Sequence, residues 1–162
     1  MNTIITVSTI MSMYMSLVTD VENSKHCYNA DIEDGKVVAM TVYDDMGKYL
    51  EADLKHVYTY DDESRLSCRE TLKWNPQLKS WQKYSCLEYA YNGSGYTIEK
   101  RYWDVTAQSY AASKEYSSYV VVTDNVLAVN HYRQNNDTGM FEEADSILVY
   151  TPSDKVYLAM EE

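Results

Sequence analysis

The residues able to act as nucleophiles or metal ligands are few and widely spaced. The histidines and cysteines are His26, His56, His131, Cys27, Cys68 and Cys86. The histidines lack the i, i+4 spacing of two zinc ligands on a helix, and no C-x-x-C pair occurs. There is no G-x-S-x-G motif and no glycine-rich phosphate loop. We therefore expect no metal, no cofactor and no nucleophilic catalysis.

Carboxylates are abundant and fall into three clusters. These are Asp44-Asp45, Asp61-Asp62-Glu63, and Glu142-Glu143 with Asp145. A glycosidase needs two carboxyl groups roughly 5–10 Å apart, so a hydrolase would use residues such as Asp61 or Glu142. Two of the clusters, however, occupy the same turn position in successive hairpins, where Asp is favoured because its side chain hydrogen-bonds the turn backbone. None has the Asp-x-Asp-x-Asp-Gly spacing of a calcium loop. A structural role therefore outweighs catalysis or calcium binding.

Aromatic residues carry the most distinctive pattern. The chain has 17 Tyr, 3 Trp and 1 Phe, so most of its rings combine an apolar face with a polar group. Three loops are flanked by residues seven apart: Trp74 and Trp81, Trp103 and Tyr110, and, in the third copy, Gln134 and Phe141. The Asn or Asp after the first flanking residue should initiate the turn. The two flanking rings should then pair across the strands and close the hairpin.

These aromatic residues have two interpretations. As a binding surface, they form a stacking platform for sugar rings or for the apolar patch of a partner protein, with the candidates Trp74, Trp81, Trp103, Tyr110 and Phe141. As structural residues, they cap the hairpin ends and fill the core of the sheet. Their recurrence in successive copies favours the structural interpretation.

Short polar turns alternate with the aromatic loops along the chain. Each turn lies between strand-like segments, as in Tyr58–Leu66 and Tyr89–Ile98. The Asp34-Gly35 pair is a strong hairpin signal, and no segment after Asp20 has helical periodicity. The sequence therefore predicts an all-β protein, an antiparallel up-and-down meander of about ten strands built from tandem hairpins. So many strands must curl or fold into two layers to bury an apolar face, and these alternatives stay open.

Cys68 and Cys86 lie almost symmetrically about the Asn75–Ser80 loop. In a hairpin they would face each other or be offset by one residue. A facing pair could form a disulfide in an exported protein. An offset of one residue would place the two side chains on opposite faces of the sheet.

Residues 1–19 contain no charged side chain and form the most apolar stretch of the chain. They are similar to the apolar region of a signal peptide, although no Lys or Arg precedes them and no small-x-small cleavage site follows. The alternative is an N-terminal strand or helix of the domain itself. The sequence thus predicts a signal peptide or apolar segment at 1–19 and a single domain at 20–162, with no integral membrane segment in the mature chain.

The chain is strongly acidic. Its formal net charge is −11 at pH 7, from 25 Asp and Glu against 14 Lys and Arg. Such a surface repels the phosphates of nucleic acids, and no basic stripe is present to bind them. We therefore exclude DNA and RNA as partners.

Several of these motifs together resemble a known family. The Tyr-x-Tyr-Asp-Asp turn at 58–62, the Arg65-Leu66 pair and the Trp74-Asn…Trp81 loop resemble small exported proteins of gut Bacteroidetes, a domain-of-unknown-function family built from tandem β-hairpins. The turns are also distantly similar to the YD repeats of secreted toxin shells. The resemblance covers roughly residues 23–162. It implies an all-β fold and export from the cytoplasm, and it implies no activity.

Three functions are compatible with these observations. The first is an exported, non-enzymatic domain that binds a glycan or a surface protein through the aromatic loops or a sheet face. The second is a structural or assembly module whose sheet edges pair with copies or partners. The third, least favoured, is the carboxylate-based hydrolase. We expect a periplasmic or secreted location, and the sequence leaves the ligand and the oligomeric state open.

Overall fold

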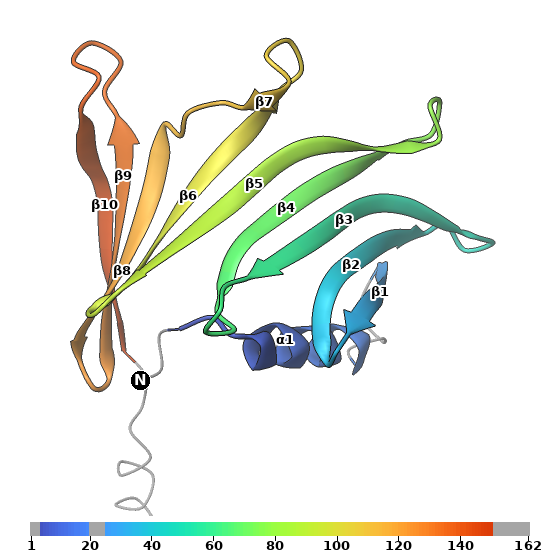
Figure 1. Ribbon diagram of the computed structural model, residues 1–162, viewed down its shortest axis with the longest axis horizontal. Helices are drawn as coiled ribbons and strands as arrows, with labels where there is room; N and C mark the ends of the chain where they lie inside the picture. Colours follow the sequence, from blue (N-terminus) through green and yellow to red (C-terminus); the bar gives the residue numbers. More distant parts are fainter. Residues whose placement is uncertain (1–3, 20–24, 151–162) are drawn as a thin grey trace, which may run out of the picture. The chain divides into compact units, whose positions relative to one another are not determined.

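The computed structural model describes residues 4–19 and 25–150. Its described helix is α1 (Val7–Thr19). The strands are β1 (His26–Glu33), β2 (Lys36–Asp45), β3 (Leu50–Tyr60), β4 (Leu66–Asn75), β5 (Ser80–Asn92), β6 (Gly95–Asp104), β7 (Ser109–Tyr110), β8 (Glu115–Thr123), β9 (Val126–Gln134) and β10 (Phe141–Tyr150). Figure 1 shows these elements in sequence colours.

The strands form a sheet in chain order. The order is β1-β2-β3-β4-β5-β6-β8-β9-β10, and the two-residue strand β7 pairs with β6. The pairs from β1 to β5 run antiparallel, and so do β6 with β8, β8 with β9 and β9 with β10. The path has two ends, β1 and β10, so the sheet is not closed. The predicted all-β meander of about ten strands is therefore confirmed.

The described residues form two compact units. The first, here called the N-terminal unit, consists of residues 5–88 and 100–112. The second, the C-terminal unit, contains residues 89–99 and the segment from 113 onwards. Helix α1 and strands β1–β4 and β7 belong to the N-terminal unit, and β8–β10 belong to the C-terminal unit.

Turn chemistry explains where the strands end. Asp34 and Gly35, between β1 and β2, have φ angles of 48° and 74°. Two successive residues with positive φ are typical of the type I′ turn, which matches the twist of a two-stranded hairpin. The hairpin predicted from this dipeptide is confirmed.

The Asp61 turn between β3 and β4 shows how an acidic cluster is used. The Asp61 carboxylate accepts hydrogen bonds from the backbone N–H groups of Glu63 (3.0 Å) and Arg65 (2.9 Å), and from Nε of Arg65 (2.7 Å). Desolvation acts to raise the pKa of Asp61, but the bonds and charge of Arg65 outweigh it and hold this pKa below its ordinary value. Asp61 is thus a turn-forming carboxylate.

Helix α1 packs on the N-terminal unit as part of its core. Thr6 starts the helix, because its carbonyl oxygen accepts from the N–H of Ile10 and its own N–H donates to Oγ1 of Thr9. The residues before the helix pair with the start of β4, where the N–H of Leu66 donates to the carbonyl of Ile5 at 2.7 Å. The helix contacts β1 and β2 and buries Ile10. In the full-length chain, residues 7–19 therefore form a helix that packs against β1 and β2.

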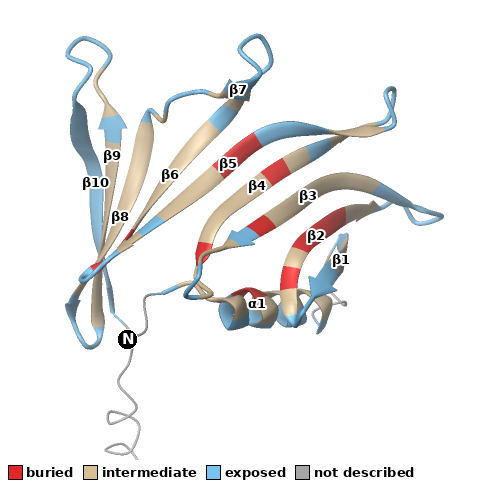
Figure 2. Cartoon of the chain, in the orientation of Figure 1, coloured by how far each residue is buried: buried red, intermediate tan, exposed pale blue. Residues whose placement is uncertain are grey.

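The buried core follows from this arrangement. Figure 2 shows buried residues on the middle strands of the N-terminal unit and on α1. The buried apolar side chains there are Ile10, Val37, Ala39, Met40, Val42, Tyr58, Leu66 and Cys86. In the C-terminal unit Tyr96 is buried, and its ring stacks on Tyr119 at 4.6 Å.

Candidate ligand-binding face

The three aromatic loops share one backbone arrangement. The side-chain oxygens of Asn75, Asp104 and Asn135 each accept hydrogen bonds from the backbone N–H groups two and three residues further on, at 2.8–3.3 Å. Four residues after each of these, the chain takes a positive φ, at Lys79 (50°), Gln108 (51°) and Gly139 (69°). The Asn or Asp that follows the first flanking residue does initiate the turn, as predicted.

These turns bring the flanking residues together in pairs. Trp74 lies opposite Trp81, with ring centroids 5.2 Å apart and planes at 64°. Trp103 lies opposite Tyr110, with centroids 5.1 Å apart and planes at 76°. Both are edge-to-face contacts, the favoured geometry for aromatic pairs. The predicted cross-strand clamps are confirmed.

A charged pair lies against the clamp formed by Trp103 and Tyr110. The Nζ atom of Lys83 is 3.3 Å from Oε1 of Glu70 and lies over the rings of Trp103 and Tyr110, 4.8 and 5.5 Å from their centroids. The hydroxyl of Tyr110 donates to the same Glu70 oxygen at 2.8 Å. Burial, together with this hydrogen bond, raises the pKa of Tyr110 well above its ordinary value, so the hydroxyl stays a donor at physiological pH.

Strand register places both clamps on one face of the sheet. Side chains alternate along β4, so Glu70, Leu72 and Trp74 point to the same side. Lys83 lies opposite Leu72 and Trp81 lies opposite Trp74. Lys83 lies over the rings of Trp103 and Tyr110, and Glu70 accepts a hydrogen bond from Tyr110. The second clamp is therefore on this side of the sheet as well. We call the set Trp74, Trp81, Trp103 and Tyr110, with Lys83 and Glu70, the aromatic face.

The aromatic face is the side of β4 that points away from α1. Arg69 precedes Glu70, so its side chain points to the opposite side. Arg69 lines a cavity together with Met13 and Leu17 of α1, which places the helix on that opposite side. The four rings of the aromatic face are half-buried, and they are absent from the buried core. They are therefore accessible in part, as a stacking surface requires.

Phe141, the fifth predicted aromatic, belongs to a separate cluster. It lies opposite Gln134, the register expected for the third loop, and is 42% exposed. Its ring contacts Tyr116 at 5.2 Å, and Tyr116 stacks on Tyr132 at 4.6 Å. All three residues belong to the C-terminal unit, whereas the aromatic face belongs to the N-terminal unit.

Sequence reasoning missed Glu70 and Lys83. The alternation of side chains along the strands could have identified both residues, because Glu70 is four residues before Trp74 and Lys83 is two residues after Trp81. In a hairpin closed at Trp74 and Trp81, both side chains must share the face of the rings.

The register of the cysteines differs from the prediction. Cys68 lies opposite Glu88 and Cys86 lies opposite Glu70, so the two cysteines are offset by two residues and both thiols are free. The predicted facing or one-residue offset was wrong, because a bulge at Tyr84 adds one residue to β5 between the loop and Cys86. Burial raises the pKa of Cys86 to about 11, with a smaller contribution from Cys68.

The histidines are engaged with different neighbours. His26 Nδ1 is 2.8 Å from Asp44, His56 Nδ1 is 3.1 Å from the Thr71 hydroxyl, and His131 Nδ1 is 3.2 Å from the Ser117 hydroxyl. Within residues 4–19 and 25–150, no three His, Cys, Asp or Glu side chains are grouped so that they could hold a metal ion.

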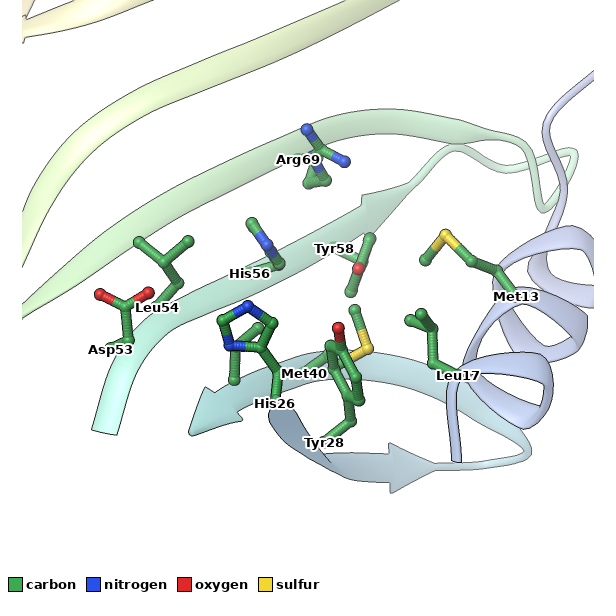
Figure 3. Close-up of a pocket in the computed structure, with 11 residues that line it drawn as sticks. Met13, Leu17, His26, Tyr28, Met40, Asp53, Leu54, His56, Tyr58 and Arg69 are labelled. Atoms are coloured by element: carbon green, nitrogen blue, oxygen red, sulfur yellow. The ribbon is translucent and has the colours of Figure 1, made fainter. Parts of the chain in front are cut away.

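A cavity of about 330 Å³ lies between α1 and strands β1–β4. Figure 3 shows Met13 and Leu17 on its helical side, with Tyr28, Met40, His56, Tyr58 and Arg69 among the strand residues that line it. The size is within the range of ligand pockets. However, α1 supplies one wall, and α1 lies within the segment that is similar to a signal peptide. The cavity is therefore a poorer candidate than the aromatic face, which needs no residue from α1.

His56 in this cavity makes stability depend on pH. Burial, reinforced by the positive charge of Arg69, lowers the pKa of His56 from 6.5 to about 4. Below pH 6.5 the unfolded chain therefore binds a proton at His56 that the folded chain does not bind. The free energy of unfolding then falls as the pH decreases from 6.5 towards 4. After allowance for the partial exposure of the ring, we expect a loss on the order of 1–2 kcal/mol between pH 7 and pH 5.

Urea unfolding of the full-length wild type, which retains α1, and of full-length His56→Gln at both pH values measures this contribution. Glutamine is uncharged throughout and can keep a hydrogen bond to Thr71, so the variant should lose less stability than the wild type over the same interval. Equal losses in the two proteins would show that His56 is not the group responsible.

The fold and site together define an all-β protein with an unclosed meander sheet and a face of paired aromatic rings. The chain belongs to a family of unknown function, DUF3836, whose model matches residues 1–123. This confirms the predicted resemblance to a family of Bacteroidetes proteins of unknown function. No curated protein matches the chain.

Two solved structures illustrate the relationship. A DUF3836 family protein from Bacteroides vulgatus ATCC 8482 is 30% identical, with a TM-score of 0.52 over 54% of this chain and 89% of that one. A protein of unknown function from Bacteroides fragilis NCTC 9343 is 21% identical, with a TM-score of 0.67 over 80% of this chain and 94% of that one. The second comparison shows a shared fold only.

Proposed function

We propose that this protein is a non-enzymatic binding module that holds a carbohydrate on its aromatic face. The observation that carries the proposal is the placement of two edge-to-face ring pairs on one side of the sheet, with Lys83 and Glu70 in contact with the second pair. The C–H faces of a sugar ring pack well on aromatic rings, whose faces are electron-rich. The charged pair supplies a donor and an acceptor for sugar hydroxyls, which neutral apolar surfaces lack.

The carboxylates support a non-enzymatic role. Asp61 is committed to its turn through Arg65. Glu142, the other predicted candidate, accepts a hydrogen bond from Nδ2 of Asn135 at 2.8 Å. Glu142 and Glu143 are adjacent in β10, so their side chains point to opposite faces of the strand. Neither Asp61 nor Glu142 therefore belongs to a pair of facing carboxyl groups such as a glycosidase uses.

The proposal is tested by retardation of the protein in native gels that contain soluble polysaccharides. A panel of neutral, acidic and branched plant and host glycans should include at least one that slows the wild type at about 0.1% polysaccharide, the concentration at which millimolar affinities become visible. Failure of every glycan to retard the folded protein would remove carbohydrate as the ligand. Binding of a surface protein to the same face would then be the next test.

We also propose that the protein is exported, with residues 1–19 acting as the signal. The support is the uncharged, apolar composition of this segment. Among residues 4–19 and 25–150, no helix is long and apolar enough to cross a membrane. Removal of α1 would expose the strand residues that line the cavity beneath it, such as Tyr28, Met40 and Tyr58.

Intact mass after cell fractionation measures this processing directly. We expect a chain that begins near residue 20 outside the cytoplasm, with three reduced thiols because Cys27, Cys68 and Cys86 are free. A full-length chain in the cytosol would contradict export. A mass lower by two hydrogens would contradict the free thiols, because it would show that a disulfide forms.

A further inference from the structure

The two oxygens of the Glu70 carboxylate have different surroundings. Oε1 accepts a hydrogen bond from the Tyr110 hydroxyl at 2.8 Å and lies 3.3 Å from Nζ of Lys83. Among residues 4–19 and 25–150, no group donates a hydrogen bond to Oε2, and this atom is not buried. The Glu70 side chain is 30% exposed. Oε2 is therefore an acceptor that a ligand can reach.

Lys83 supplies a donor next to this acceptor. Its ammonium group carries three N–H groups, so the contact with Glu70 leaves others for a ligand. Its Nζ lies over the rings of Trp103 and Tyr110, and the side chain is 45% exposed. An accessible donor and an accessible acceptor thus lie side by side against the second clamp.

Two adjacent hydroxyl groups of a sugar ring match this arrangement. A hydroxyl group both donates and accepts, so one can donate to Oε2 of Glu70 while its neighbour accepts from Nζ of Lys83. Both hydrogen bonds involve a charged group, which makes them stronger than bonds between neutral groups. The C–H face of the same sugar can pack on the rings of the clamp.

The charges beside the rings favour a neutral sugar over an acidic one. Lys83 pairs with Glu70, and Arg101 pairs with Glu88 at 3.0 Å. Arg101 is two residues before Trp103 in β6, so side-chain alternation places it on the same side of the sheet. A uronate or sulfate group would have to compete with these carboxylates for the two cations. It would also be repelled by the net charge of −11 on the whole chain.

We propose that the aromatic face binds neutral glycans that present two adjacent free hydroxyl groups, and that Glu70 is the residue that selects them. This inference rests on the proposed carbohydrate binding and specifies its chemistry. Lys83 donates to the second hydroxyl. Tyr110 is a positioning residue as well as part of the clamp, because its hydroxyl holds Oε1 of Glu70 and so directs Oε2 towards the ligand.

Native gels with neutral and acidic polysaccharides test the class of ligand. The neutral probes are galactomannan, xyloglucan and mixed-linkage β-glucan, and the acidic probes are polygalacturonate and chondroitin sulfate. At least one neutral probe should retard the wild type at a concentration about tenfold lower than either acidic probe requires.

The gels also separate this inference from the proposed function. Retardation by the acidic probes at an equal or lower concentration than the neutral ones overturns the inference and leaves carbohydrate binding in place. Absence of retardation by every neutral probe also overturns the inference. If no glycan of any kind retards the protein, the proposed function fails as well.

Glu70→Gln tests the acceptor while keeping the size of the side chain. Glutamine retains one oxygen for the Tyr110 hydroxyl but replaces Oε2 with an N–H donor, so affinity for the neutral glycan should fall about tenfold or more in isothermal titration. Asp31→Asn is the matched control, because Asp31 pairs with Lys55 at 3.3 Å on β1, and β2 and β3 separate β1 from β4. Equal affinities of the two variants overturn the role of Glu70.

Tyr110→Phe tests the positioning role, because it keeps the ring beside Trp103 and removes only the hydroxyl. Affinity should fall about threefold or more in the wild-type background. In the Glu70→Ala background it should not fall further, since that variant has no carboxylate to hold. Equal losses in the two backgrounds would show that the Tyr110 hydroxyl does not act through Glu70 and would overturn this part of the proposal.

Discussion

Replacing Gly95 by alanine is expected to destabilise the protein by about 3 kcal/mol or more, whereas the same change at Gly93 is expected to be nearly neutral. Gly93 lies in the connection between β5 and β6, and Gly95 is the first residue of β6. A Cβ atom at Gly95 would overlap the backbone carbonyl of Tyr119, while a Cβ at Gly93 has no atom within 4 Å. The two substitutions therefore differ in packing and not in composition.

The overlap at Gly95 is costly because its neighbour is backbone. Gly95 lies opposite Val120, and the N–H of Val121 donates to the carbonyl of Ser94 at 2.9 Å. To make room for a methyl group, β8 must move away from β6, which also separates the stacked rings of Tyr96 and Tyr119. A flexible side chain could rotate aside, but a paired strand has no such freedom.

Urea unfolding followed by circular dichroism compares Gly95→Ala, Gly93→Ala and the wild type. We expect the transition midpoint to fall only for Gly95→Ala, with a similar slope if unfolding remains two-state. Similar midpoints for the two variants would mean that the approach of β6 to β8 is looser than the structure describes.

Loss of two rings from the aromatic face is expected to weaken carbohydrate binding at least tenfold. The double variant Trp81→Ala with Trp103→Ala removes one ring from each clamp and leaves Trp74 and Tyr110 without their edge-to-face partners. At protein interfaces, binding energy is concentrated in a few residues that are often Trp or Tyr, and truncation of such a residue costs about 2 kcal/mol or more. A tenfold change corresponds to 1.4 kcal/mol or so, which makes it a conservative expectation.

Phe141→Ala is the matched control for this experiment. Phe141 flanks the third aromatic loop in the same way, but it packs on Tyr116 in the C-terminal unit. Phe141→Ala also removes an aromatic side chain, but it should leave carbohydrate binding unchanged. Affinity is read from gel retardation and isothermal titration with the glycan that binds the wild type.

Thermal melting of the same variants separates binding from folding. The loss of each ring pair should cost about 1 kcal/mol of stability beyond the loss of buried apolar area, and the unfolding transition should stay cooperative. If the double variant unfolds, the rings are core residues, and the carbohydrate proposal fails in its present form. Unchanged binding by a folded double variant would also contradict it.

Short-range features of this protein were accessible from its sequence. The Asp34-Gly35 hairpin, the turns begun by Asn75 and Asp104, and the ring pairs that close those loops all depend on residues within about ten positions of one another. Strand alternation and turn spacing then sufficed for an all-β meander. These features are determined locally, because the residues of a turn and the length of its loop fix how the two flanking strands pair.

What only the tertiary structure decided is the register between strands and the contacts that cross it. A single extra residue at Tyr84 shifts Cys86 from its expected partner, and no local rule places a bulge there. The charged pair of Lys83 and Glu70 reaches Tyr110 only because β4, β5 and the β6–β7 hairpin adjoin. The position of α1 on the sheet likewise depends on a distant apolar face, since amphipathic packing and not composition determines where an uncharged helix docks.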